Sequence, residues 1–157
     1  MLKKGQRAPD FVLQALDGQE RTLSEILSHG PVLLAFFKVT CPVCQYTFPF
    51  LDRLHAASPP GALQWYGISQ DNPVATHRFL REYSVSFPTL LDTYASGYKV
   101  SNAYGIRAVP AAFLVERDGQ ISLAMEGFEK GVLEDLGKRL GVAAFEKGES
   151  IPVFRPG

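Results

Sequence analysis

The chain has 157 residues, of which 46% are hydrophobic and 11% aromatic, enough to build a sizeable core within one domain. Sixteen basic residues balance sixteen acidic ones, and no basic block stands out, which argues against nucleic acid or a membrane surface as a partner. No segment approaches the roughly 18 apolar residues that span a bilayer, and residues 6–10 are polar where a signal peptide needs an apolar region. We therefore expect a soluble, cytoplasmic protein.

The first 30 residues predict a hairpin followed by a short helix. The apolar residues 11–13, followed by Asp17 and Gly18, are typical of a strand that turns back on itself. Thr22 and Glu25 have the spacing of a capping box, so a helix is expected to start there and to run through residue 27. We interpret this part as an N-terminal extension laid beside the main domain.

The next stretch organises the rest of the chain. Residues 32–37 are six consecutive apolar residues, which predicts a strand buried on both faces. Residues 42–57 have helical spacing, with a kink expected at Pro49. Cys41 and Cys44 thus stand where a strand passes into a helix. The unpaired N–H groups and the positive dipole end of a helix start favour negative charge on sulfur, which indicates a redox-active dithiol.

Strands and helices alternate through most of the remaining chain. Asn72 and Pro73 are typical of a helix start, and Gly105 suits a left-handed position after a helix. The apolar patterns predict strands at 63–69, 87–92, 111–115 and 121–125, and helices at 73–83, 97–104 and 129–140.

This order predicts an α/β fold whose sheet has a parallel centre and an antiparallel edge, with helices on both faces. We assign the whole chain to one domain, with an extension at 1–30, a core at 31–140 and an extended tail at 141–157 that packs as a strip. Chemistry in such sheets collects at the carboxyl ends of the strands, where the cysteines are expected.

Two cysteines three positions apart close too small a ring to stabilise the fold much, which leaves a catalytic or a metal-binding role. Zinc needs about four ligands, and the chain has no second cysteine pair, while His29, His55 and His77 follow no ligand spacing. We therefore expect neither a metal nor another cofactor.

These residues resemble a known family. Cys41-Pro42-Val43-Cys44 after a buried strand, with Pro49 five residues further on and Val109-Pro110 before a later strand, resembles the thioredoxin fold. The longer pattern is similar to the TlpA/ResA-like thiol-disulfide oxidoreductases and the related alkyl hydroperoxide reductase/thiol-specific antioxidant superfamily. It covers roughly residues 6 to 140, in the segments 8–11, 66–69, 87–92, 103–106 and 110–119. The resemblance implies a three-layer α/β/α fold with an N-terminal hairpin.

The resemblance also implies roles for single residues. Cys41 is expected to be the nucleophile that forms a mixed disulfide with a protein partner, and Cys44 the resolving thiol that releases it. Pro110 is expected to be a cis proline facing the cysteines, with the Val109 backbone offering strand-like hydrogen bonds to a bound peptide. The expected rim of this docking surface is formed by Thr40, Pro42 and Val43.

The implied reaction is thiol-disulfide exchange with disulfide-bearing or thiol-bearing proteins, sustained by an upstream thiol reductant. We expect a monomer or a weak dimer. Three positions depart from the relatives: Ala35 and Thr47 stand where thioredoxins and ResA-type proteins carry carboxylates, and Thr40 stands where a tryptophan is common. The proton acceptor for Cys44 is therefore unassigned, with water as one candidate.

Two further predictions concern the reactivity of the Cys41-Cys44 pair. Pro42 lacks an N–H and Val43 offers no side-chain donor, which favours a potential nearer the reducing end of the range for this fold. We interpret Lys38, three residues before Cys41, as a solvated residue at a strand end and not as a group that lowers the pKa of a thiol.

Two alternatives stay open. Peroxiredoxins carry the pattern Pro-x-x-x-Thr-x-x-Cys, and aligning its cysteine with Cys44 places Phe37 and Cys41 at the Pro and Thr positions, with Arg107 the neighbour of the family's arginine near Pro110. A thiol-dependent peroxidase is therefore a weaker reading than a disulfide oxidoreductase. A non-enzymatic redox sensor on the same scaffold is the other alternative.

Overall fold

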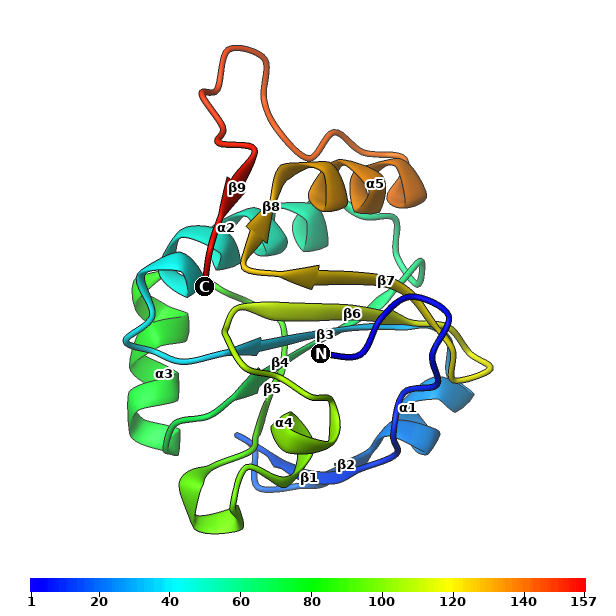
Figure 1. Ribbon diagram of the computed structural model, residues 1–157, viewed down its shortest axis with the longest axis vertical. Helices are drawn as coiled ribbons and strands as arrows, with labels where there is room; N and C mark the ends of the chain where they lie inside the picture. Colours follow the sequence, from blue (N-terminus) through cyan, green and yellow to red (C-terminus); the bar gives the residue numbers. More distant parts are fainter.

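The computed structural model describes residues 1–157 and is built around a seven-stranded sheet with the order β2-β1-β5-β4-β3-β6-β7 (Figure 1). The strands of this sheet are β1 (Val12–Ala15), β2 (Glu20–Thr22), β3 (Val32–Phe37), β4 (Gln64–Ser69), β5 (Thr89–Leu91), β6 (Ala111–Val115) and β7 (Ile121–Glu126). The helices are α1 (Leu23–Ser28), α2 (Pro42–Ala57), α3 (Pro73–Glu82), α4 (Lys99–Ala103) and α5 (Lys130–Leu140). A separate two-stranded ribbon joins β8 (Phe128–Glu129) to β9 (Phe154–Arg155).

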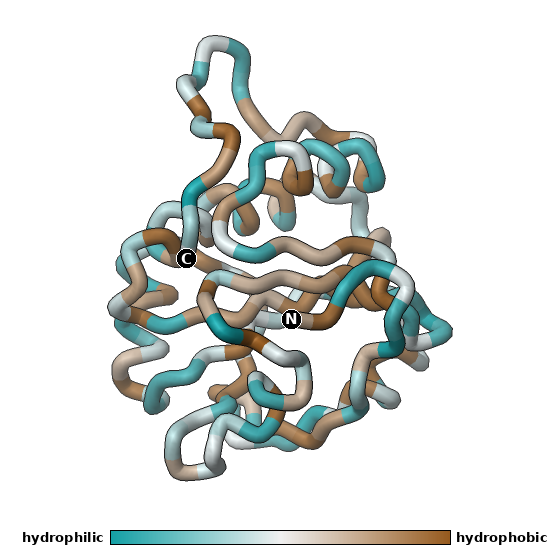
Figure 2. The backbone as a smooth tube through the Cα atoms, viewed as in Figure 1, coloured by the Kyte–Doolittle hydropathy of each residue, from teal (hydrophilic) through white to brown (hydrophobic).

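The centre of the sheet is parallel and both edges are antiparallel. β3 pairs in parallel with β4, and β4 with β5. β6 and β7 extend the sheet antiparallel on one side, and β1 and β2 do so on the other. Every residue of β3 is buried, and the hydrophobic colouring in Figure 2 is strong along the central strands. The prediction of a parallel centre with an antiparallel edge is confirmed.

Helices cover both faces of the sheet, as predicted. One apolar cluster joins β3 to α2, α3 and α5 through residues such as Phe48, Phe79 and Leu136. The other joins the opposite face of β3 to α1 and α4, with Tyr104 packed against Phe36 at a ring distance of 5.4 Å. Because both faces of β3 are covered, its carboxyl end is held firmly, and that end positions the first cysteine.

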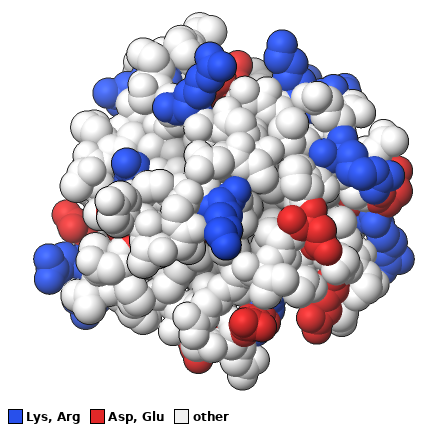
Figure 3. Space-filling model, turned by 60° about the horizontal axis from the view of Figure 1, so that its bottom comes forward, with Lys and Arg blue, Asp and Glu red and all other residues white.

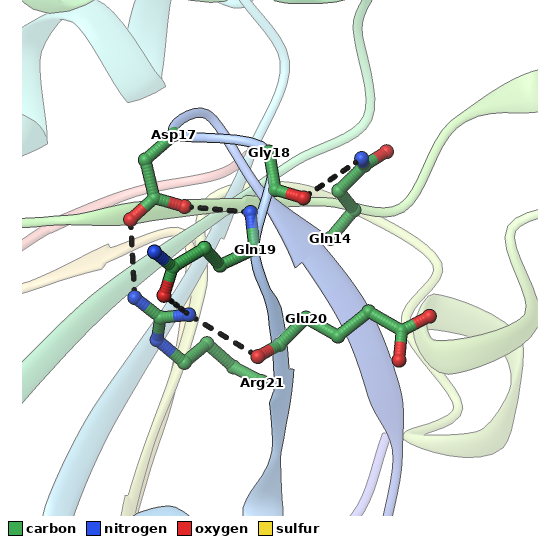
Figure 4. A network of polar contacts seen from close by, with 6 residues as sticks. All are labelled: Gln14, Asp17, Gly18, Gln19, Glu20 and Arg21. Atoms are coloured by element: carbon green, nitrogen blue, oxygen red, sulfur yellow. Dashed lines mark hydrogen bonds and ion pairs between the residues drawn. The ribbon is translucent and has the colours of Figure 1, made fainter.

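The N-terminal hairpin is part of the main sheet, which corrects the expectation that it lies beside it. Val12–Ala15 pairs with β5 as well as with β2. Gly18 turns the hairpin at a φ of +85°, Asp17 accepts a hydrogen bond from the backbone N–H of Gln19 at 2.9 Å, and Arg21 pairs with Asp17 at 3.1 Å (Figure 4). The sequence predicts the hairpin and its Asp-Gly turn, but not the pairing of β1 with β5.

The helix expected at 97–104 is shorter than predicted. A 3-10 turn at Tyr94–Ser96 comes first, and α4 runs only from Lys99 to Ala103. Gly97 and Tyr98 both have positive φ, of 73° and 50°, so the backbone between them cannot continue a right-handed helix. Gly105 takes the left-handed conformation that was predicted for it, at a φ of +67°.

The tail contributes the second ribbon, which was not predicted. Phe154 and Arg155 pair with Glu129 and Phe128 of β8. Val153 and Phe154 are 78% and 54% exposed, so these two residues are held mainly through the backbone, whereas Ile151 packs against the core. Figure 1 shows the tail rising above α5 and descending to end beside the start of α2.

No helix combines the length with the apolar character that crossing a membrane requires. The face drawn in Figure 3 carries basic and acidic side chains scattered among uncharged ones, without a broad field of one sign. Pro49 lies inside α2 as expected; the kink at that position stays a prediction.

Candidate active site

Cys41 is the N-cap residue of α2, at the carboxyl end of β3. Its backbone is extended, with φ −81° and ψ 114°, and Pro42 begins the helix. The Cys41 sulfur accepts a hydrogen bond from the backbone N–H of Cys44 at 3.1 Å. The sulfur thus takes the place that a Ser or Asp oxygen takes at other helix starts, where an unpaired N–H and the helix dipole favour negative charge. This is the placement expected of an attacking thiolate.

Cys44 lies one helical turn further on and is sealed from solvent. Its side chain has no exposed surface, whereas Cys41 is partly exposed, and both thiols are free. Burial raises the pKa of the Cys44 thiol far above its usual value, and the hydrogen bond with Cys41 adds to this effect. The two sulfurs therefore differ in access and in charge preference, since only Cys41 can meet a partner and Cys44 is held as a neutral thiol.

Val109 lies against Cys41, and Pro110 follows it. The peptide bond between them is cis, as the family resemblance implied. The thiol of Cys41 donates a hydrogen bond to the Val109 carbonyl oxygen at 3.3 Å. Pro110 is buried and Val109 is half-buried, so the Val109 backbone is the part of this segment that lies nearest to the reactive sulfur.

The other predicted rim residues surround Cys41. Thr40 and Pro42 are exposed, and Val43 is half-buried and packs against the main core. The structure thus places residues 40–44 and Val109 together around the Cys41 sulfur; the contact of the rim residues with a partner and the role of Pro110 stay predictions.

The two positions that lack a carboxylate are both buried. Ala35 lies in the middle of β3, and the Thr47 hydroxyl donates to the Val43 carbonyl oxygen at 2.6 Å. Neither side chain can accept a proton from Cys44, as the sequence indicated.

Asp71 is an acidic residue near the pair that sequence reasoning missed. Its carboxylate accepts a hydrogen bond from the backbone N–H of Val39 at 2.8 Å, and its negative charge contributes to raising the pKa of Cys44. It follows β4 at the same sheet edge as Cys41, so its position at the carboxyl end of a parallel strand was the available signal. Asp71 is the acidic side chain whose charge acts on the buried thiol.

A pocket of about 430 Å³ opens beside Cys41. Its wall includes Lys38, Tyr98, Arg107 and Val109, together with Gly157 from the tail. Gly157 lies so close to Val109 that a Cβ on it would collide with the Val109 carbonyl group, and Arg155 lies 4.6 Å from the ring centroid of Tyr46 on α2. The sequence did not connect the tail with the cysteines, because the two are more than a hundred residues apart.

The histidines lie outside this site. His55 packs against Trp65 and lies 3.7 Å from Asp52, and His77 is an exposed residue of α3. No group of three or more His, Cys, Asp or Glu side chains is arranged to hold a metal ion.

A mixed sheet covered by helices on both faces is the architecture of the thioredoxin fold. In this protein a helix starts at the Cys-x-x-Cys pair, and a cis proline follows the residue that contacts Cys41. The protein therefore has the thioredoxin fold and a redox-active dithiol. Solved structures agree with this class. The thioredoxin domain of a thiol-disulfide oxidoreductase from Bacteroides vulgatus superposes with a TM-score of 0.78 at 21% identity, covering 89% of this chain and 99% of the other. A putative thiol:disulfide interchange protein DsbE from Chlorobium tepidum gives a TM-score of 0.75 at 26% identity, with coverages of 92% and 100%.

The chain belongs to the AhpC/TSA family, whose model matches residues 4–124, and it has the fold and the paired cysteines of a thiol-disulfide oxidoreductase. Thiol-disulfide oxidoreductase ResA from Halalkalibacterium halodurans is 31% identical over 122 residues, which are 77% of this chain and 67% of the relative. ResA from Bacillus subtilis is 28% identical over 127 residues, 80% of this chain and 69% of the relative. The chain thus spans about two thirds of the length of these relatives.

Proposed function

We propose that the protein exchanges its Cys41-Cys44 dithiol or disulfide with disulfide-bearing protein partners through a mixed disulfide at Cys41. The observation that carries this proposal is the unequal placement of the two sulfurs, one partly exposed at a helix start and the other fully buried one turn later. A partner sulfur can reach only Cys41. Cys44 is then positioned to attack the resulting bond from inside the protein.

The reduction of a partner proceeds in two displacements. The Cys41 thiolate attacks one sulfur of the partner disulfide, and the electron pair of the broken bond leaves on the other partner sulfur. Cys44 loses its proton and attacks Cys41, which forms the Cys41-Cys44 disulfide and frees the second partner thiolate. Since burial favours the Cys44 thiol, deprotonation of Cys44 is the expected slow part of the second step, and a thiol reductant must then restore the dithiol.

The docking edge for the partner is the Val109 backbone. Gly157 lies against that backbone, so a partner that pairs with Val109 has to displace the end of the tail. The last residues of the tail are held by the two-residue β8–β9 pairing and by the Arg155 guanidinium over the Tyr46 ring, so displacing them breaks a short ribbon and leaves the main sheet intact.

Turnover with a disulfide-bonded protein and dithiothreitol tests the proposal. We expect the protein to accelerate reduction of the substrate and Cys41→Ser to abolish the acceleration. A Cys41→Ser variant that retains the wild-type rate would contradict the proposed role. Redox titration of the pair against glutathione then gives the direction of electron flow, with a potential expected toward the reducing end of the range from about −120 to −270 mV.

The peroxidase alternative is not favoured by the site. Cys44, the residue that aligns with the peroxidatic cysteine, has no exposed surface, and Phe37 and Cys41 stand where that pocket has Pro and Thr. A peroxide molecule therefore has no open path to Cys44. The single-domain organisation, the cytoplasmic location and the monomeric or weakly dimeric state stay predictions.

A further inference from the structure

The pocket beside Cys41 carries an excess of positive charge. Lys38 and Arg107 are both exposed on its wall, and no ion pair in the structure involves either of them. No Asp or Glu lines the pocket, and the terminal carboxylate of Gly157 is the one carboxylate on its wall, so two cations stand against one carboxylate. The net charge of the chain is zero, so the two unpaired cations next to the reactive sulfur are a local feature. They favour an anionic ligand.

The α4 side of the pocket, which contributes Ser101 and Asn102 to its wall, is held in place by a buried polar network. Asp92 is fully buried and accepts hydrogen bonds from the Val100 N–H at 3.3 Å, the Ser101 N–H at 2.7 Å and the Ser101 hydroxyl at 2.7 Å. Gln70 in turn donates to the Ser101 hydroxyl at 3.0 Å. Three donors thus satisfy the Asp92 carboxylate, and the α4 side of the pocket is preorganised.

Lys38 and Tyr98 stand together at one side of this pocket. The Lys38 ammonium lies 5.8 Å from the centroid of the Tyr98 ring, a separation at which a cation and an aromatic face still attract each other. Tyr98 is placed there by its positive φ of 50° at the start of α4. The ammonium is therefore oriented by a ring and not by a carboxylate, which leaves its charge free for a ligand.

The tail limits the size of that ligand. With Gly157 against the Val109 backbone, the edge that would pair with an extended peptide is covered, while the pocket of about 430 Å³ stays open to Cys41. This volume lies in the range of small-molecule sites. With the tail in place, a small carboxylate-bearing thiol can enter the pocket directly, whereas a protein strand must first displace the tail.

We propose that this pocket binds the upstream reductant, a low-molecular-weight thiol bearing carboxylate groups, with Lys38 and Arg107 attracting its negative charge. The inference rests on the proposed function, because it names the reductant of the same disulfide. The first thiolate attacks the Cys41 sulfur, and the electron pair of the disulfide leaves on Cys44, which takes up a proton. A second thiolate attacks the small-molecule sulfur of the mixed disulfide, which releases the small-molecule disulfide and the Cys41 thiolate.

The test compares three thiols of different charge as reductants of the oxidised protein: glutathione, which is anionic, 2-mercaptoethanol, which is neutral, and cysteamine, which is cationic. The variants are Lys38→Gln, Arg107→Gln and the double variant. Arg78→Gln is the control, since Arg78 is an exposed arginine of α3 that does not line the pocket. Rates are taken as ratios to wild type for each thiol, so that the intrinsic nucleophilicity of the thiol cancels.

We expect the double variant to lower the glutathione rate about tenfold, the size expected for two solvent-exposed charge pairs. The 2-mercaptoethanol rate should stay within about twofold, and the cysteamine rate should rise. Alkylation of the reduced protein gives a readout without turnover, because the same substitutions should slow iodoacetate relative to iodoacetamide.

Equal changes for all three thiols, or no change with glutathione, would overturn the inference. A loss confined to a protein disulfide, with glutathione unaffected, would also overturn it and would assign the two cations to an acidic protein partner. If the wild-type protein also fails to accelerate reduction of a protein disulfide by dithiothreitol, the proposed function itself fails. The dithiothreitol assay therefore separates the two failures.

Discussion

The burial of Cys44 has a measurable consequence for the stability of the reduced protein. The pKa of Cys44 is raised in the folded state because burial disfavours the thiolate, whereas in the unfolded chain the thiol ionises near its ordinary value of about 8.5. Above that pH the unfolded state binds fewer protons than the folded state, so the free energy of unfolding must fall as pH rises. The stability that the buried Cys44 thiol contributes is complete below about pH 8 and is lost progressively at higher pH.

The size of the effect follows from one proton. Each pH unit above the unfolded pKa lowers the free energy of unfolding by about 1.4 kcal/mol, so the loss between pH 7 and pH 10 is about 2 kcal/mol. The assay is urea unfolding at four pH values with a phosphine reductant. Cys44→Ala should be less stable at pH 7 and should lack this part of the pH dependence, while Cys41→Ala, which keeps Cys44, should retain it. Wild type and Cys44→Ala curves that run parallel from pH 7 to 10 would refute the reasoning.

Two other perturbations test how the site is built. Asp92→Asn removes the buried charge that accepts three hydrogen bonds. We expect the free energy of unfolding, measured in urea, to fall by about 3 kcal/mol. A fall of less than about 1 kcal/mol would mean that the network does not support α4. Deletion of residues 151–157 uncovers the Val109 backbone. We expect reduction of a protein disulfide to become several-fold faster, while the rate of reduction of the Cys41-Cys44 disulfide by 2-mercaptoethanol stays within about twofold. A slower reaction with the protein disulfide would contradict this and would show that the tail assists docking.

The elements that the sequence predicted well are those with a strong local signal. The six apolar residues of β3 and the helical spacing after Pro42 place Cys41 at the start of a helix without any tertiary information. Their order along the chain was enough to predict the parallel centre of the sheet.

The features that sequence reasoning missed depend on contacts between distant segments. The pairing of β1 with β5 joins residues that are more than 70 positions apart. The approach of Gly157 to Val109 depends on backbone pairing between β8 and β9, two strands of two residues each, which are too short to leave a hydrophobic period. The pocket charges of Lys38 and Arg107 come together only once β3 and β6 are neighbours.

Trapping the mixed disulfide tests most directly that Cys41 attacks the partner and that Cys44 resolves the mixed disulfide. Cys44→Ser and Cys41→Ser are each mixed with a disulfide-bonded protein, and intact mass and peptide mapping report which cysteine carries the adduct. We predict that Cys44→Ser accumulates a one-to-one adduct at Cys41 and that Cys41→Ser forms none, since Cys44 has no exposed surface. An adduct at Cys44 in the Cys41→Ser variant, formed as fast as the adduct at Cys41, would contradict the account.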